Sequence, residues 1–168
     1  MRRPLLWAFI LASVMGASGR AWATDDDDGT RATLKRLTAF DVVLGIAGSE
    51  EYTSRIDSTA LRTSIELRLR ESGLKVKEYG VPVLSVWFWG RPAGEGGCIS
   101  YGRLSVYQHV SLVRDPSITE LVSTWTTEEF DACKCTETNS HVAERARSLM
   151  DQFMNAFLAA NPRKVGGK

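Results

Sequence analysis

The chain is poor in the residues that most often carry chemistry. Its 168 residues include only two histidines and three cysteines, and its 21 basic residues nearly balance its 20 acidic ones. The basic residues do not cluster, as binding to a phosphate backbone would require, so no nucleic acid partner is expected. Beyond Met15 no apolar run approaches the ~20 residues of a membrane-spanning helix, so no span is expected in the mature chain.

Catalytic and cofactor signatures are also missing. His109 lies within a predicted strand whose neighbouring serines are not in exposed turns, so it has no nucleophile to activate. Glu128 and Glu129 are adjacent on a strand and point to opposite faces, which does not make a facing carboxylate pair. The glycine-rich segment 90–97 lacks the Gly-Lys-Ser/Thr ending and the following helix of a phosphate-binding loop. We therefore predict no catalytic residue and no cofactor.

The first residues have the pattern of a secretory signal. Two arginines precede an apolar run over residues 5–15, and Ala21 and Ala23 stand at the two positions that signal peptidase recognises. Cleavage after Ala23 is expected, and it places the mature chain in the periplasm or outside the cell. The alternative is a segment retained as an N-terminal anchor, for which the apolar run is short.

Composition divides the chain into a signal segment, an acidic tail, one domain and a short C-terminal tail. The acidic run 25–28 lacks the spaced ligands and the turn glycine of a calcium loop, so we interpret it as solvated. The predicted parts are residues 1–23 as the signal peptide, 24–37 as an acidic flexible N-terminal tail, 38–162 as a single α/β domain, and 163–168 as a disordered tail.

Hydrophobic periodicity predicts an α+β fold. Alternating strands are expected near 40–47, 74–79 and 83–89, and a long hairpin over 100–130. Helices are expected from residue 57 or 58 to 72 and from 139 or 140 to 160; the second has an apolar stripe through Phe153 and a polar face that includes Arg145. The predicted architecture is a two-layer sandwich in which two helices pack on a mostly antiparallel four- to five-stranded sheet, in the order β-α-β-β-β-β-α.

The hairpin predicts how the cysteines pair. If the chain folds back between Pro116 and Ser117, Leu112 faces Leu121 and the apolar faces of the two strands coincide. The same register puts Cys98 opposite Cys135, and a two-residue slip puts it opposite Cys133. Directly opposed side chains lie close enough for a bridge. We predict a disulfide from Cys98 to Cys135, or else to Cys133.

Two other uses of the cysteines remain open. The Cys133 and Cys135 pair could be redox-active and exchange which of its members bonds to Cys98. Alternatively, Cys98, Cys133, Cys135 and His141 could form a zinc site. The spacing of the pair is tighter than either motif usually has, and an oxidising compartment favours the disulfide. No metal site is therefore predicted.

The strand at 83–89 has large apolar side chains on both faces. Leu84, Val86 and Phe88 alternate with Ser85, Trp87 and Trp89. Burial of both tryptophans beneath a helix or a tail is the commoner arrangement. The alternative is an exposed aromatic patch that recognises a partner. This candidate interaction surface comprises Trp87, Trp89, Tyr101, Tyr107 and His109.

The order of elements behind a signal segment resembles small two-layer α/β envelope proteins of bacteria, and its layout is similar to that of the lipopolysaccharide-assembly lipoprotein. The runs 71–76 (ESGLKV) and 157–162 (FLAANP) also resemble uncharacterised secreted bacterial proteins. No lipidation cysteine follows Ala23 here. We predict a secreted, non-enzymatic interaction domain, such as an auxiliary subunit that binds another envelope or membrane-complex protein. The alternatives are a thiol/disulfide-active or hydrolytic periplasmic enzyme and a small-ligand or glycan-binding protein.

Overall fold

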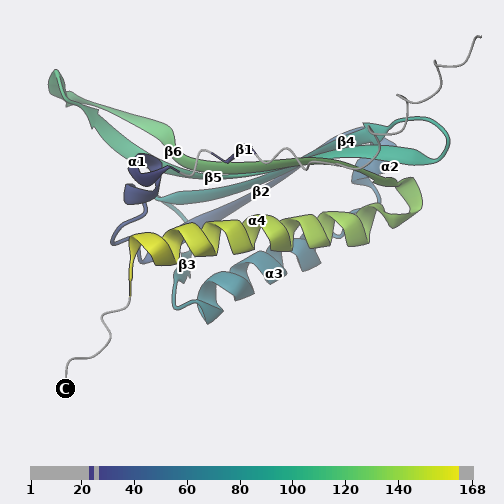
Figure 1. Cartoon of the computed structure of the whole chain (residues 1–168), viewed down its shortest axis with the longest axis horizontal. Helices are drawn as coiled ribbons and strands as arrows, with labels where there is room; N and C mark the ends of the chain where they lie inside the picture. The colour runs from purple at the N-terminus through teal and green to yellow at the C-terminus, as the bar shows by residue number, and fades with distance from the viewer. Residues whose placement is uncertain (1–22, 25–26, 163–168) are drawn as a thin grey trace, which may run out of the picture.

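A computed structural model describes residues 23–24 and 27–162. Two long helices lie side by side on one face of a six-stranded sheet (Figure 1). The elements are β1 (Ala23–Thr24), α1 (Asp28–Ala32), β2 (Ala39–Gly48), α2 (Glu50–Thr53), α3 (Ser58–Glu71), β3 (Lys75–Lys77), β4 (Val83–Pro92), β5 (Gly97–Leu112), β6 (Asp115–Lys134), the 3-10 turn η1 (Cys135–Glu137) and α4 (Thr138–Ala160). None of the helices within these ranges is long and apolar enough to cross a membrane.

The predicted α+β two-layer class is confirmed, but the sheet is mixed rather than mostly antiparallel. Its strand order is β1-β6-β5-β4-β2-β3, and β2 pairs in parallel with both β3 and β4. The parallel pairing of β2 with β3 follows from α3, because a helical crossover returns the chain to the same end of the sheet. The order also differs in detail, since β1, α1 and α2 were not predicted.

The long hairpin is confirmed, but its predicted register is wrong. The chain turns at Val113 and Arg114, earlier than expected, so Leu112 pairs with Asp115 while Leu121 pairs with His109. Two register shifts interrupt the ladder, between positions 106 and 107 and between 111 and 112 of β5. A bulge inserts an unpaired residue, and hydrophobic alternation alone does not locate it.

The segment expected to be a flexible tail contains ordered structure. Asp27 caps helix α1 by accepting a hydrogen bond from the Thr30 amide at 2.6 Å, and Leu34 is fully buried in the core. Thr33 donates to the carbonyl of Thr124 on β6, which ties α1 to the hairpin. An acidic residue can cap a helix as well as solvate a tail, so this expectation is corrected for residues 27–37. The predicted signal segment up to residue 22 and the tail 163–168 lie outside the described residues.

Helix α4 supplies the centre of the core. Its apolar stripe, which the sequence predicts from Val142 to Leu158, is buried except for Leu158, which is 43% exposed. The Phe153 ring packs edge-on against Phe40 of β2 at 5.6 Å and Trp125 of β6 at 5.7 Å between centroids. The helix can lie this close because residue 102 of β5 is a glycine. A Cβ at this position would fall only 3.2 Å from a methyl carbon of Leu149.

The substitution Phe153→Ala should therefore be strongly destabilising. Removing a fully buried phenylalanine leaves a cavity between both layers, and such changes lower the free energy of unfolding by about 3–5 kcal/mol. Urea unfolding followed by circular dichroism measures the loss. The matched control Leu158→Ala, on the exposed side of the same helix, should change stability by about 0.5 kcal/mol or less; equal effects of the two variants would contradict the assignment of the core.

Candidate functional site

The face of the sheet away from α3 and α4, called here the outer face, carries a row of aromatic side chains. Along β4 and β5, buried positions that face the helices alternate with partly exposed ones. In the ladder Trp89 of β4 lies beside Tyr101 of β5, and Tyr101 lies beside Phe130 of β6. Trp87 lies in the neighbouring row, beside Arg103. These four aromatic residues (Trp87, Trp89, Tyr101 and Phe130) form the outer aromatic patch.

The patch is open to solvent. Trp87 is 45% exposed and Phe130 is 65% exposed, although both are large apolar side chains. Trp89 is also exposed, as is Val43 on the neighbouring strand β2. The commoner arrangement expected from sequence, burial of both tryptophans, is therefore wrong. Adjacent aromatic side chains on three strands, of which Trp87, Trp89 and Phe130 are exposed and Tyr101 is partly buried, are unusual for a surface with no partner.

Gly45 allows the indole of Trp87 to lie against the sheet. The two residues are partners in the parallel β2–β4 ladder, and a Cβ at Gly45 would lie 1.9 Å from Cε3 and 2.1 Å from Cζ3 of the indole. Any larger side chain at position 45 would have to displace the ring. The glycine thus lets the indole rest on the backbone of β2.

Hydrogen bonds hold the rest of the outer face in place. The Tyr101 hydroxyl donates to Glu128 at 2.6 Å, and Arg103 donates to the Thr126 hydroxyl at 3.2 Å. Burial, together with the hydrogen bond to the Glu128 carboxylate, raises the pKa of Tyr101 to about 12. Tyr101 therefore stays a neutral donor, and its ring keeps one orientation beside Trp89 and Phe130.

The structure brings together part of the predicted interaction surface. Trp87, Trp89 and Tyr101 are neighbours, whereas Tyr107 pairs with Val83 at the end of the β4 ladder and His109 lies in the part of the hairpin beyond β4. Sequence reasoning missed Phe130. Phe130 could have been found only from the correct hairpin register, because it lies opposite Tyr101 in the observed ladder but not in the predicted one.

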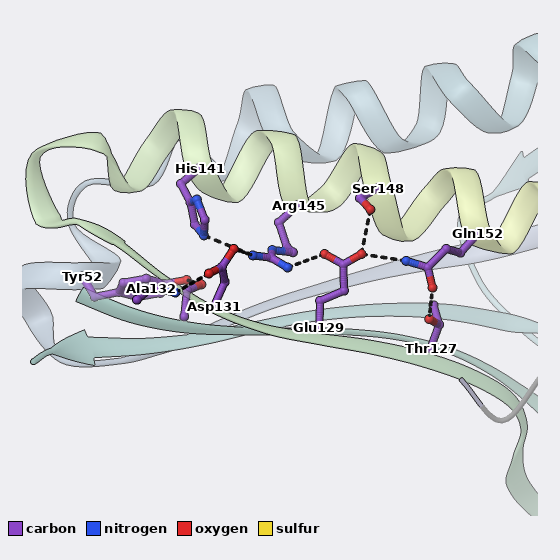
Figure 2. A network of polar contacts seen from close by, with 10 residues as sticks. Tyr52, Thr127, Glu129, Asp131, Ala132, His141, Arg145, Ser148 and Gln152 are labelled. Carbon is purple, nitrogen blue, oxygen red and sulfur yellow. Dashed lines mark hydrogen bonds and ion pairs between the residues drawn. The ribbon is translucent and has the colours of Figure 1, made fainter. Parts of the chain in front are cut away.

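Beneath α4 lies a second cluster, a chain of buried polar contacts between α4 and β6 (Figure 2). Arg145 donates to Glu129 at 2.5 Å and to Asp131 at 2.5 Å. Glu129 also accepts from Ser148 at 2.7 Å and from Gln152 at 2.6 Å, and Gln152 in turn accepts from Thr127. Glu129 is only 4% exposed and Arg145 only 8%. Arg145, predicted on the polar face of this helix, is therefore buried in the network rather than solvated.

The charges of this network stabilise one another. Burial acts to raise the pKa of Asp131, but hydrogen bonds from the Ala132 amide and from Arg145 outweigh it, so the pKa lies below its ordinary value. Burial and the nearby Arg145 cation lower the pKa of His141. The donors and acceptors of α4 and of the sheet satisfy one another's hydrogen bonds, so the network stabilises the packing of the helix on the sheet.

The cysteines lie at the base of the β5–β6 hairpin and in η1, just before α4. Cys98 and Cys135 form a disulfide with their Cα atoms 4.9 Å apart, which confirms the first of the two predicted pairings, while Cys133 is free. The zinc set cannot form in this state because two of its thiols are bonded to each other. The described residues also contain no cluster of three or more potential metal ligands. His141 contacts the Arg145 guanidinium instead, at 3.4 Å.

A shallow cavity of about 560 Å³ lies between α3 and α4. Its lining includes Arg68 and Asp151, which form an ion pair, and the apolar side chains of Met154 and Leu158. None of its lining residues belongs to the outer aromatic patch, the buried network or the cysteine cluster. The cavity therefore contributes no side chain to those three sites.

The solved structures that match this chain include two at low identity. The PelC dodecamer from Paraburkholderia phytofirmans matches at 13% identity over 73% of this chain and 92% of that chain, with a TM-score of 0.37. Rare lipoprotein B from Shewanella oneidensis matches at 16% identity over 69% and 93%, with a TM-score of 0.35. No protein-family model matches the chain, and neither does any curated protein sequence. Both matches fit no more than the weak, layout-level resemblance predicted from the sequence.

Breaking the buried ion pair should destabilise the fold more than replacing it. Arg145→Ala leaves Glu129 charged, buried and unpaired, and such changes lower the free energy of unfolding by about 3–5 kcal/mol. The double variant Arg145→Met with Glu129→Met removes both charges, so it should recover most of that loss. Urea unfolding of both variants tests this. A double variant as unstable as Arg145→Ala would contradict the account.

His141 should make stability depend on pH. Its folded-state pKa lies below the ordinary value of 6.5, so between those two values the unfolded chain binds more protons and the free energy of unfolding rises with pH. Acidification below pH 6.5 therefore loses stability. Arg145, Asp131, Glu144 and Glu129 are the charged groups that act on the imidazole. In urea unfolding at several pH values, His141→Asn should flatten the slope just below pH 6.5; an unchanged slope would show that His141 does not contribute.

Proposed function

We propose that this chain is a secreted, non-enzymatic interaction domain of the bacterial envelope that binds a protein partner through the outer aromatic patch. The observation that carries the proposal is the exposure of Trp87, Trp89 and Phe130 on a face that α3 and α4 leave open. Tryptophan, tyrosine and arginine dominate the binding energy of protein interfaces, and they cluster at the centre of the contact.

The rigidity of the patch supports the same proposal. Gly45 lets the Trp87 indole rest against the sheet, and the bond to Glu128 orients Tyr101. Side chains that are already ordered lose little conformational entropy on binding, so more of their contact energy appears as affinity. Arg103, Glu128 and Thr126 supply hydrogen-bonding groups beside the aromatic rings, as the polar surroundings of an interface do.

The disulfide supports an extracytoplasmic location. Bridges such as Cys98–Cys135 persist in the periplasm and outside the cell and are rare in the reducing cytosol. The signal pattern that ends at Ala23 points the same way. A thiol-dependent enzyme is less well supported, because burial raises the pKa of the Cys133 thiol whereas catalytic thiols usually have lowered pKa values.

Site-specific photo-crosslinking in intact cells tests the proposed surface. A photoreactive residue at position 130, in the full chain, should give one discrete adduct with a partner protein. The matched control at Leu67, exposed on α3 in the helical layer, should not give this adduct. Adding Trp89→Ser should reduce the adduct at position 130 strongly, since loss of a central aromatic weakens binding by about 2 kcal/mol, or roughly thirty-fold.

Two outcomes would count against the proposal. One is equal crosslinking at positions 130 and 67, which would indicate collision without a defined face. The other is no adduct at position 130 in cells where the protein is abundant and folded. Circular dichroism of the purified Trp89→Ser variant serves as the folding control.

A further inference from the structure

The three cysteines lie on one face of the hairpin base, beneath the start of α4. Cys133 is the ladder partner of Cys98, so strand alternation turns both side chains toward the helical layer. Cys135, the first residue of η1, reaches the same face through its bond to Cys98. The disulfide nevertheless joins Cys98 to Cys135, leaving the directly opposed Cys133 as a free, partly exposed thiol. A free thiol thus faces one end of an existing disulfide.

We propose that the hairpin base carries an intramolecular thiol–disulfide exchange, in which Cys133 displaces Cys135 from Cys98. Directly opposed residues in an antiparallel ladder have Cβ atoms about 4.5–5.5 Å apart, and a disulfide needs about 3.5–4.5 Å. A small local adjustment therefore suffices to form the second bridge. This activity is independent of the outer aromatic patch, which lies on the other face of the sheet.

The step is balanced within the chain. The Cys133 thiolate attacks Sγ of Cys98, a Cys98–Cys133 bond forms, and the Cys98–Cys135 bond breaks. The electron pair of the broken bond leaves on Sγ of Cys135, which takes up the proton that Cys133 gave to water. One disulfide and one thiol exist before and after, so neither an oxidant nor a reductant is needed.

The surroundings of Cys133 influence how fast this step proceeds. Burial raises the pKa of its thiol, and the carboxylates of Asp131 and Glu137 act in the same direction, while Thr138 and Arg145 act against them. Thiolate is the attacking species, so exchange should be slow at neutral pH and should accelerate as the pH rises. Because Cys133 and Cys98 are ladder partners, the reaction is unimolecular, which offsets a low thiolate fraction.

The exchange would change how α4 is attached to the sheet. Cys135 is the first residue of η1, which leads directly into α4, so the present bridge tethers the start of the helix to β5. In the exchanged form the crosslink lies inside the β5–β6 ladder. The start of η1 would then be held by hydrogen bonds such as that from the Cys135 amide to the Gly96 carbonyl, at 2.8 Å.

Pulse alkylation of the full chain tests the exchange. The oxidised protein is incubated at a series of pH values, labelled briefly with excess N-ethylmaleimide, quenched in acid and digested at low pH for mass mapping. We expect label on Cys133 at first and then also on Cys135, appearing faster at higher pH. The rate should not change on tenfold dilution, because the step is intramolecular. Label confined to Cys133 at every pH, with Cys133 fully modified, would overturn the proposal.

A variant supplies the second test. Cys135→Ser should oxidise to a Cys98–Cys133 disulfide in a glutathione redox buffer, and the control Cys133→Ser should keep the Cys98–Cys135 bridge and take up no label. A Cys135→Ser protein that stays folded, by circular dichroism, with both thiols free would also overturn the proposal. If Cys135→Ser does not fold, pulse labelling of the unaltered chain decides the matter.

Discussion

The contact on which the structure most depends is the buried bridge from Arg145 to Glu129 and Asp131. A charged pair in the interior is costly unless its geometry is satisfied, and here Ser148 and Gln152 complete the acceptor sites of Glu129. Shifting α4 by one turn along the sheet would leave Glu129 buried without its cation. The bridge therefore specifies where α4 lies on β6, and with it the position of Phe153 in the core. Once α4 and α3 occupy one face of the sheet, the aromatic side chains of the alternate positions are left on the other.

Two glycines determine what each face of the sheet can accept. On the helical face, Gly102 leaves room for α4, because a side chain there would meet Phe88, Arg145 and Leu149. On the outer face, Gly45 leaves room for the Trp87 indole. Each glycine gives up side-chain packing within its strand, which weakens a strand locally, and in return allows a larger group to approach the backbone. A glycine in a strand thus allows both the close packing of α4 on one face of the sheet and the placement of the Trp87 indole on the other.

Sequence reasoning recovered the features that depend on periodicity and missed those that depend on long-range pairing. The apolar stripe of α4 and the long hairpin follow from local patterns. The Cys98–Cys135 bridge was predicted correctly, but from a register that the structure does not have, since Cys98 lies opposite Cys133 in the ladder. The bulges of the hairpin and the parallel pairing of a three-residue strand have no such signal. Alternation shows that Trp87 and Trp89 share a face, but not which face the helices cover. Arg145 looked like a solvent-facing residue because its partners, Glu129 and Asp131, lie on another element.

Helix α4 is held at two points that differ in chemistry. Its approach through η1 is fixed covalently at Cys135, and its middle is fixed by the Arg145 network, which needs no sulfur. Between the two points His141, in the first turn of α4, contacts Arg145, so the polar contacts extend back to that turn. A change of disulfide partner would thus alter only the attachment of the first turn, because the ion pairs and the Phe153 contacts hold the remaining turns. The outer face depends on those remaining turns and on the sheet, so the cysteine chemistry and the aromatic surface can operate in one small domain without interfering.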